Sequence, residues 1–145
     1  MKILISRCLL GEPCRYDGKS KPVPAAETLR RAGHTLVPVC PEVLGGLPTP
    51  RPPAECQPDG RVLNREGVDV TAQYRLGAER ALELARREGC AFAVLKANSP
   101  SCGGLHIYDG TFSKTLVSGQ GVAAQLLSQA GIQVVDEDHI PPELL

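Results

Sequence analysis

Three of the six cysteines in this chain follow short apolar runs, and this arrangement strongly constrains the fold. The runs and the cysteines that follow them are residues 3–5 with Cys8, residues 36–39 with Cys40, and residues 92–95 with Cys102. If the runs are parallel strands, their carboxyl ends meet at one edge of a sheet, where open α/β folds bind ligands. The pattern therefore predicts that distant thiols converge in one crevice, as a metal or cluster site requires.

The rest of the chain alternates between strand-like and helix-like segments. We expect strands at 2–6, 35–39, 91–95 and 132–135, and helices at 25–32, 71–88 and 122–130. Residues 11–24 and 41–57 are rich in glycine and proline and are expected to be irregular, while 61–63 suits a hairpin arm and 108–111 a turn. Long loops inside a compact domain are usually functional. The order predicts an α/β fold, a single Rossmann-like domain over residues 1–145 with a mainly parallel sheet flanked by helices.

Composition narrows the classes of function. The chain has 145 residues, 16 basic and 16 acidic, and only five aromatic side chains (two Phe, three Tyr). Balanced charge and scarce aromatics give no strong nucleic-acid signal, and no apolar run is long enough to span a membrane. Without a signal-peptide pattern we expect a cytoplasmic protein. Cysteines in a reducing compartment favour metal binding or catalysis over disulfides.

The cysteines divide into two groups. Cys8 alone would suit a small buried apolar side chain, the usual role of a free cysteine, but Cys40 and Cys102 in equivalent positions favour a shared site. Cys14 lies close behind Cys8 in the sequence. By contrast, Cys56 and Cys90 stand without neighbouring motif residues and are expected to be structural.

Glu42 lies two residues after Cys40, in a loop that prolines and glycines stiffen. A carboxylate beside a metal-bound group can act as a general acid or base. A surface glutamate is the ordinary alternative. The stiff loop favours the functional interpretation.

Residues 99–104, Ser-Pro-Ser-Cys-Gly-Gly, combine two hydroxyls, a thiol and two glycines. Glycine lets the backbone approach a ligand closely, and the hydroxyls of Ser99 and Ser101 are short hydrogen-bonding groups. A plain turn also uses Ser, Pro and Gly. The cysteine in the middle of the segment favours a ligand site.

Two further patterns are weaker. Gly119-Gln120-Gly121 resembles a dinucleotide-binding motif, but its place late in the chain favours a tight helix start whose free amides face the crevice and attract an anion. His34, His106 and His139 are spread apart without ligand spacing. Of these, His106 is near a cysteine motif, and we expect it to be solvent-exposed.

The number of thiols bears on the metal. Structural zinc takes four ligands, typically in closely spaced pairs, and this chain has no Cys-x-x-Cys pair. With Cys14 as a fourth ligand, zinc or a fully ligated cluster is possible. Three thiolates with one open position instead describe an iron–sulfur cluster with one iron available to a substrate.

The combined motifs resemble the thiouracil desulfidase family of small bacterial proteins, over nearly the whole chain. The motifs are Cys8-Leu9-Leu10-Gly11, Cys14-Arg15-Tyr16-Asp17-Gly18, Cys40-Pro41-Glu42 with the following Gly45-Gly46, Thr49-Pro50-Arg51, Gly67-Val68-Asp69, Ser99-Pro100-Ser101-Cys102-Gly103 and Ile107-Tyr108-Asp109-Gly110. Together they are far more specific than any one motif alone.

The resemblance implies a [4Fe-4S] cluster held by Cys8, Cys40 and Cys102, with a fourth iron open to the sulfur of a thiolated pyrimidine. It implies a non-redox, hydrolase-type reaction in which water replaces sulfur, giving uracil from 2-thiouracil. Glu42 would transfer the proton, and Ser101, or less strongly Ser99, would bind the substrate. Cys14 would be a further ligand or a thiol that handles released sulfide.

Two points qualify the resemblance. Ala97-Asn98 stands where a more charged pair is expected, which bears on substrate choice. Neutral overall charge and the lack of an additional domain favour a free base or nucleoside over transfer RNA, and the sulfide acceptor stays open. The alternatives are a zinc-binding protein with a structural or binding role, and a metal-free thiol or persulfide module.

Overall fold

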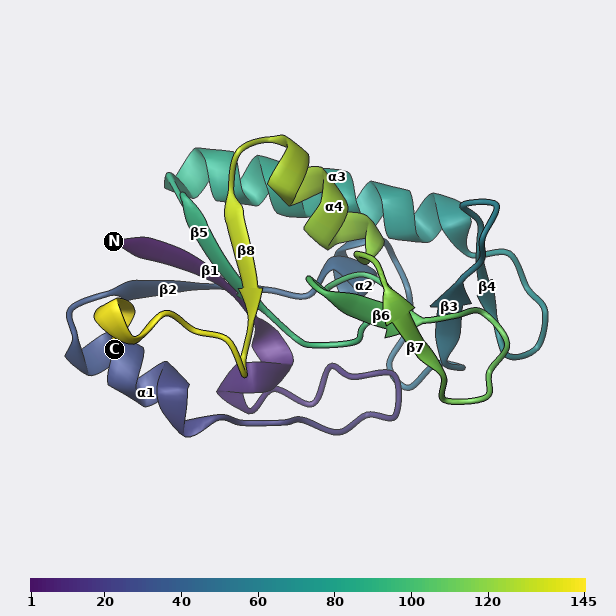
Figure 1. Ribbon diagram of the computed structural model, residues 1–145, viewed down its shortest axis with the longest axis horizontal. Helices are drawn as coiled ribbons and strands as arrows, with labels where there is room; N and C mark the ends of the chain where they lie inside the picture. Colours follow the sequence, from purple (N-terminus) through teal and green to yellow (C-terminus); the bar gives the residue numbers. More distant parts are fainter.

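A parallel sheet of four strands forms the centre of the molecule (Figure 1). The computed structural model describes residues 1–145. In spatial order the strands are β2 (Thr35–Val39), β1 (Lys2–Ser6), β5 (Phe92–Leu95) and β8 (Gln133–Asp136). All three neighbouring pairs run parallel. The predicted α/β fold with a mainly parallel sheet is confirmed.

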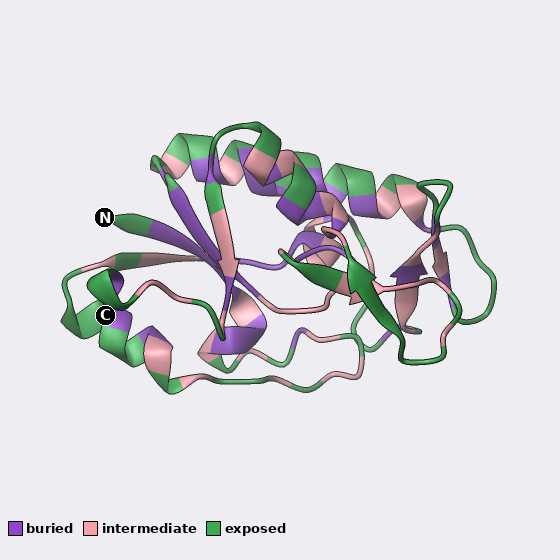
Figure 2. Cartoon of the chain, viewed as in Figure 1, coloured by how far each residue is buried: buried purple, intermediate pink, exposed green.

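The two central strands are the most apolar because both of their faces are covered. In β5 every residue is buried, and in β1 every residue except Lys2 is buried. Figure 2 shows these strands as the buried centre of the molecule. Continuous apolar runs are typical of strands covered on both sides, which is why the sequence identified them.

Helices cover the two faces of the sheet. The long helix α3 (Thr71–Glu88) and α4 (Val122–Gln129) pack together on one face, while α1 (Pro24–Arg31) covers the other. Side chains of β1 alternate between these layers: Leu4 packs in the core beneath α3 and α4, and Ile3 and Ile5 pack on the α1 side. The fold is therefore Rossmann-like, with a helical layer on each face.

The predicted boundaries of the main elements are accurate. Strand β2 and helix α3 have the expected ends, and Gly89 closes α3 in the left-handed conformation with a φ of 73°. At the amino end of α3 the N-cap residue is Val70, which makes no side-chain capping bond, and the Asp69 side chain accepts a hydrogen bond from the Thr71 amide.

Two small hairpins lie beside the sheet, and their strands were largely unpredicted. Antiparallel β3 (Ala54–Cys56) pairs with β4 (Val62–Asn64), and β6 (His106–Tyr108) pairs with β7 (Leu116–Ser118). The stretch 41–57, expected to be irregular, contains β3 and the short helix α2 (Pro41–Leu44). Three-residue strands are too short to show a period of two. The hairpin arm expected at 61–63 is confirmed as β4.

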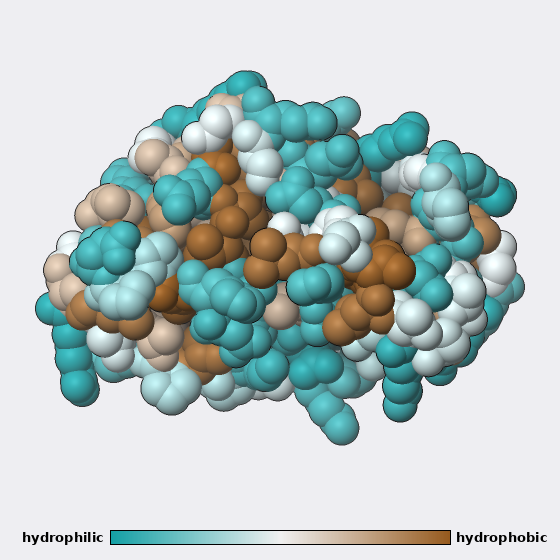
Figure 3. Space-filling model, viewed as in Figure 1, coloured by the Kyte–Doolittle hydropathy of each residue, from teal (hydrophilic) through white to brown (hydrophobic).

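Short 3₁₀ helices complete the chain, at Arg7–Leu10 directly after β1 and at Pro142–Leu144 near the carboxyl terminus. No helix combines the length and the apolar character that a membrane crossing requires. Figure 3 shows an apolar area on one face of the molecule around the β6–β7 hairpin, where Leu105, Leu116 and Val117 are exposed.

Candidate active site

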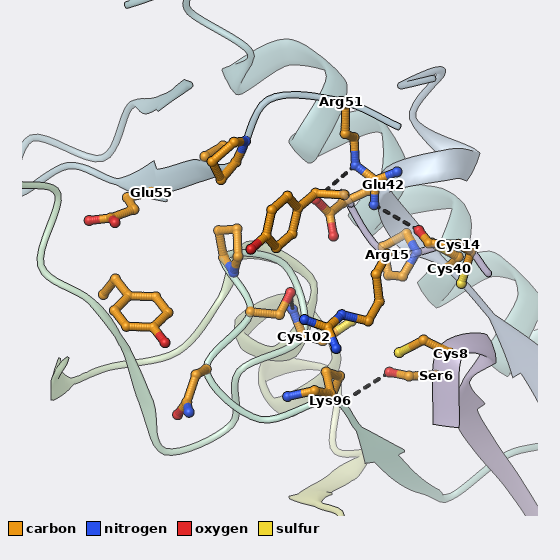
Figure 4. A pocket seen from close by; sticks show the side chains of 18 of the residues that line it. Ser6, Cys8, Cys14, Arg15, Cys40, Glu42, Arg51, Glu55, Lys96 and Cys102 are labelled. Carbon is orange, nitrogen blue, oxygen red and sulfur yellow. Dashed lines mark hydrogen bonds and ion pairs between the residues drawn. The ribbon is translucent and has the colours of Figure 1, made fainter. Parts of the chain in front are cut away.

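A cavity of about 410 Å³ opens at the carboxyl ends of β1, β2 and β5. Four cysteines line it: Cys8, Cys14, Cys40 and Cys102. Figure 4 shows them on one side of the cavity, with Cys102 reaching toward the other three. The cavity is of a size suited to a small ligand. The structure thus brings together the thiols that the sequence pattern predicted to converge.

Local structure explains how each thiol reaches the cavity. Cys8 lies on the 3₁₀ turn that follows β1, and Cys40 is the N-cap residue of α2 directly after β2. Cys102 follows β5 on the serine-rich loop. Cys14 lies in the loop after Cys8, and its carbonyl oxygen accepts a hydrogen bond from the Cys40 thiol at 3.9 Å. A sheet edge therefore fixes three attachment points, and a loop supplies the fourth.

The thiols are buried and sit close to one another. Contact with the Cys14 thiol and burial raise the pKa of Cys40, and burial raises the pKa of Cys102 to about 12. The hydroxyls of Ser101 and Ser6 act in the opposite direction on Cys102. Buried thiols of this kind ionise when a cation binds them, because the metal supplies the missing positive charge.

The spacing of the thiols bears on the kind of metal centre. No three side chains among the His, Cys, Asp and Glu residues lie close enough to hold a single metal ion. The closed zinc site of Cys8, Cys14, Cys40 and Cys102 stays the alternative prediction. Cysteine thiolates are the usual ligands of iron–sulfur clusters, and several such thiols line this cavity.

Glu42 is one of two carboxylates that line the cavity, and its two oxygens have different partners. Oε1 accepts hydrogen bonds from the Tyr74 hydroxyl at 2.5 Å and from Arg51 Nε at 3.4 Å. Oε2 accepts a hydrogen bond from Ser101 Oγ at 3.3 Å. The side chain retains 15% exposure and lines the cavity. The Glu42 carboxylate is therefore fixed by hydrogen bonds at the cavity, and Glu42 is not the ordinary surface glutamate that was the alternative.

Arg51 is a buried residue to which the sequence assigned no role. Its side chain is 3% exposed, and beyond Glu42 it donates hydrogen bonds to the carbonyl oxygen of Cys14 at 3.0 Å. Further bonds run to the Pro48 carbonyl and the Thr49 hydroxyl. Arg51 thus links the Cys14 loop to the Glu42 carboxylate. The only signal in the sequence was its place in the Thr-Pro-Arg motif.

The two serines of the loop after β5 have distinct positions. Ser99 Oγ accepts hydrogen bonds from the Ser101 and Cys102 amides at 3.2 and 3.1 Å. Its own hydrogen is then free to be donated to Ser101 Oγ, 3.1 Å away. Ser101 in turn donates to Glu42. Ser101 is only 1% exposed, whereas Ser99 lines the cavity.

The start of α4 corrects one expectation. Its backbone amides were expected to face the crevice and attract an anion. Instead they bond to carbonyls of the serine loop: Gly121 to Gly103 at 2.8 Å, Val122 to Pro100 at 2.9 Å, and Ala124 to Ser101 at 3.0 Å. Gly121 is required there, because a Cβ atom would lie 2.5 Å from the Ser101 carbonyl carbon. The helix start therefore anchors the loop and offers no anion site.

The wall opposite the thiols comes from the two hairpins. Glu55 of β3 lies on that side of the cavity (Figure 4) and is 7% exposed. Its Oε1 accepts hydrogen bonds from the amides of Gly110 at 2.9 Å and Phe112 at 3.1 Å. The Arg65 guanidinium lies 5.9 Å from the centre of the Phe112 ring. Glu55 was missed, because a single glutamate in a proline-rich stretch gives no sequence signal.

Lys96 is a further cavity residue without a prior assignment. It follows β5, and its ammonium lies 3.3 Å from Glu137 Oε2. The Glu137 side chain is 2% exposed, and its other oxygen accepts a hydrogen bond from the Ala97 amide at 2.6 Å. The Lys96 amide donates to Ser6 Oγ at 2.9 Å. This network fixes the end of β5 next to Cys102.

The remaining candidates lie away from the cavity. Cys56 is half-buried on β3 and donates a hydrogen bond to the Pro100 carbonyl at 3.4 Å, and Cys90 is buried in the core beneath α3. Neither lines the cavity. The three histidines do not line it either: His106 and His139 are exposed, and His34 is half-buried, with its Nε2 2.9 Å from the Leu144 carbonyl oxygen.

Comparison with known proteins agrees with this arrangement. Residues 3–139 match the 2-thiouracil desulfurase family. The uncharacterized protein YbbK of Bacillus subtilis (strain 168) is 40% identical over 149 residues, covering 95% of this chain and 97% of YbbK. A solved structure of the [4Fe-4S]-dependent thiouracil desulfidase TudS superposes with a TM-score of 0.91 at 49% identity, covering 99% of this chain and 94% of TudS.

The fold is that of an α/β protein with a Rossmann-like sheet and a thiol-lined cavity at the carboxyl ends of its strands. The family match over residues 3–139 spans nearly the whole of that fold. The chain belongs to the 2-thiouracil desulfurase family, and the resemblance drawn from its motifs is confirmed.

Proposed function

We propose that this protein is a [4Fe-4S]-dependent desulfidase that converts a thiolated pyrimidine of the 2-thiouracil type into the corresponding oxo-pyrimidine. In the balanced reaction, water replaces sulfur on carbon and hydrogen sulfide is released, without a change in oxidation state. The observation that carries the proposal is that Cys8, Cys40, Cys102 and Glu42 line one cavity. The relationship to TudS, a [4Fe-4S]-dependent thiouracil desulfidase, supports it.

The residues present fit such a cluster. Thiolates are the usual ligands of iron–sulfur clusters, and the thiols of Cys8, Cys40 and Cys102 surround the cavity from three attachment points. When bound there, a cluster with three protein ligands supplies one iron with an open position for a soft sulfur atom. Cys14 adjoins Cys8 and Cys40 and is either a further ligand or a thiol for released sulfide.

Glu42 would carry the proton transfer. Its Oε1 is occupied by Tyr74 and Arg51, so Oε2 is the oxygen that exchanges a proton with water or with a ring nitrogen of the pyrimidine. A positioned carboxylate of this kind contributes about 10²- to 10⁴-fold to a rate. Glu42 would then activate the attacking water and return the proton to the product or to sulfide.

The two serines would share the binding of the substrate and the support of Glu42. Ser99 lines the cavity and is positioned to contact the pyrimidine, while the buried Ser101 passes a hydrogen bond from Ser99 to Glu42. The Ser101 hydroxyl, free to rotate, also lies 3.5 Å from the Cys102 sulfur. Both serines therefore belong to the proposed site, with Ser99 nearer to the substrate.

The test is anaerobic purification and reconstitution, followed by an iron and sulfide assay and then the addition of 2-thiouracil. We expect a brown protein with about four irons and four sulfides per chain, and uracil formed with an equal amount of sulfide. A protein that stays colourless after reconstitution would contradict the proposal. Brown protein that is inert with 2-thiouracil but active with another thiolated pyrimidine would support the chemistry and correct the substrate.

A further inference from the structure

Tyr74 is a buried residue that touches the proposed site through one atom only. Its ring packs with Val62 and Val70 in a small core cluster between α3 and the β3–β4 hairpin, and the residue is 2% exposed. It does not line the cavity. Its hydroxyl donates a hydrogen bond to Glu42 Oε1 at 2.5 Å. Anything that Tyr74 contributes to the reaction must therefore pass through Glu42.

Glu42 is the hydrogen-bond partner of the Tyr74 hydroxyl. Glu42 Oε1 receives only the Tyr74 hydroxyl and Arg51 Nε, the latter at a longer 3.4 Å. The other nitrogens of the Arg51 guanidinium donate hydrogen bonds to the Cys14 and Pro48 carbonyl oxygens and to the Thr49 hydroxyl. Arg51 is therefore bound mainly to the loops, and Tyr74 makes the short contact that fixes the carboxylate.

The two oxygens of Glu42 thus have separate roles. A carboxylate with a free side-chain torsion rotates about that bond and points its oxygens in many directions. A donor on Oε1 fixes the plane of the carboxylate and leaves Oε2 on the side of Ser101. Groups that are held in the reactive geometry before the substrate arrives are the ones that accelerate reactions.

We propose that Tyr74 is a positioning residue for the desulfidation: its hydroxyl holds Oε1 of Glu42 so that Oε2 faces the substrate. The inference rests on the proposed function, because it concerns the carboxylate that would transfer the proton. Tyr74 touches neither the substrate nor the thiols. Burial and the charge of Glu42 raise the pKa of Tyr74, so its hydroxyl remains a donor at any working pH.

The experiment compares Tyr74→Phe with wild type in the cluster-loaded enzyme. Phenylalanine keeps the ring and removes only the hydroxyl. We expect kcat to fall about tenfold, the loss that one hydrogen bond to a charged group produces, while KM and iron per chain change less than twofold. A crystal structure of the variant should show the Glu42 carboxylate rotated or in two orientations.

A matched control separates positioning from packing. Val70→Ala removes apolar contact beside the same ring, leaves the hydroxyl in place, and is expected to lower thermal stability at unchanged kcat. An equal fall of kcat in both variants, or an unchanged kcat and Glu42 orientation in Tyr74→Phe, would overturn the inference. Wild-type protein that turns over no thiolated pyrimidine would instead overturn the proposed function, so the two failures are distinguishable.

Discussion

Gly45 and Gly77 bring the backbones of α2 and α3 into direct contact. A Cβ atom on Gly77 would lie 1.9 Å from the Pro41 carbonyl oxygen, and one on Gly45 would lie 2.0 Å from the Gln73 carbonyl oxygen. No side chain fits between the two helices at this point. Because α2 carries Glu42 and α3 carries Tyr74, the crossing sets the distance between these two residues.

Gly77→Ala is therefore expected to separate the helices. The added methyl group has no space against backbone atoms, and overpacking of this kind typically costs about 1–3 kcal/mol. Urea unfolding would measure the loss of stability. Gly104→Ala is the control, because its Cβ atom would lie at ordinary contact distances, 3.5 Å from Val134 Cγ1 and 4.0 Å from the Val134 carbonyl oxygen. Equal stability of the two variants would contradict the close backbone contact between α2 and α3 at Gly77.

Substitution of individual cysteines should divide them by iron content. After anaerobic reconstitution, Cys8→Ser, Cys40→Ser and Cys102→Ser are each expected to lose most of the iron, since each removes a thiolate ligand. Cys90→Ser, outside the cavity, is the matched control and should keep it. Cys14→Ser decides whether that thiol is a ligand. Full iron in Cys102→Ser would refute the proposed ligand set.

Glu42→Gln should separate cluster binding from turnover. Glutamine keeps the shape of the side chain and an acceptor for Tyr74, but it cannot exchange a proton at Oε2. We expect iron content equal to wild type and a kcat about 10²- to 10⁴-fold lower. Single-turnover assays with 2-thiouracil measure the chemical step. Loss of iron in parallel with the loss of rate would assign Glu42 a structural role instead.

Part of the fold and of the site was predictable from the sequence, and part was not. The strands β1, β2 and β5 were predictable because each is a short apolar run, and the parallel order made the meeting of Cys8, Cys40 and Cys102 predictable as well. The roles of Arg51 and Tyr74 were not predictable, because they depend on which distant residue the end of a long side chain contacts in the folded protein. The β6–β7 hairpin was not predicted, because strands of three residues are too short to show an alternating apolar pattern.

His139 gives the folded protein a pH-dependent contact outside the site. Its ring nitrogen lies 2.7 Å from Asp136 Oδ1, and this hydrogen bond and the charge of Asp136 raise the pKa of His139 above its ordinary 6.5. A raised folded pKa means that the contact stabilises fully below pH 6.5 and is lost as the pH rises through the folded pKa.

The difference in urea midpoint between wild type and His139→Gln, followed from pH 5 to pH 9, should therefore shrink as the pH rises. The difference is expected to be small, because the histidine is exposed. A difference that grows with pH would contradict the assignment of the contact.

Glu55→Ala should release the loop between β6 and β7. The change removes the acceptor of the half-buried Gly110 and Phe112 amides, and the cost is expected to be about 1 kcal/mol, the lower end of the penalty for an unsatisfied buried group. Hydrogen exchange of these two amides should accelerate at least tenfold, with exchange in β5 unchanged. Unaltered exchange of the Gly110 and Phe112 amides would show that other contacts hold the loop.

Neither of the two hairpins that form the outer wall of the cavity joins the central sheet, and beyond their own pairing only single β-bridges link their strands to the chain, from Leu63 to Asp69 and from Ile107 to Asn98. The thiols and Glu42, by contrast, are attached to the ends of sheet strands. The outer wall can therefore be exchanged separately from the rest of the site. Hairpins taken from a relative would change the shape of the cavity and so the molecules that fit it, while the thiols and Glu42 would keep their positions at the sheet. Such chimaeras offer a route to desulfidases with chosen substrates.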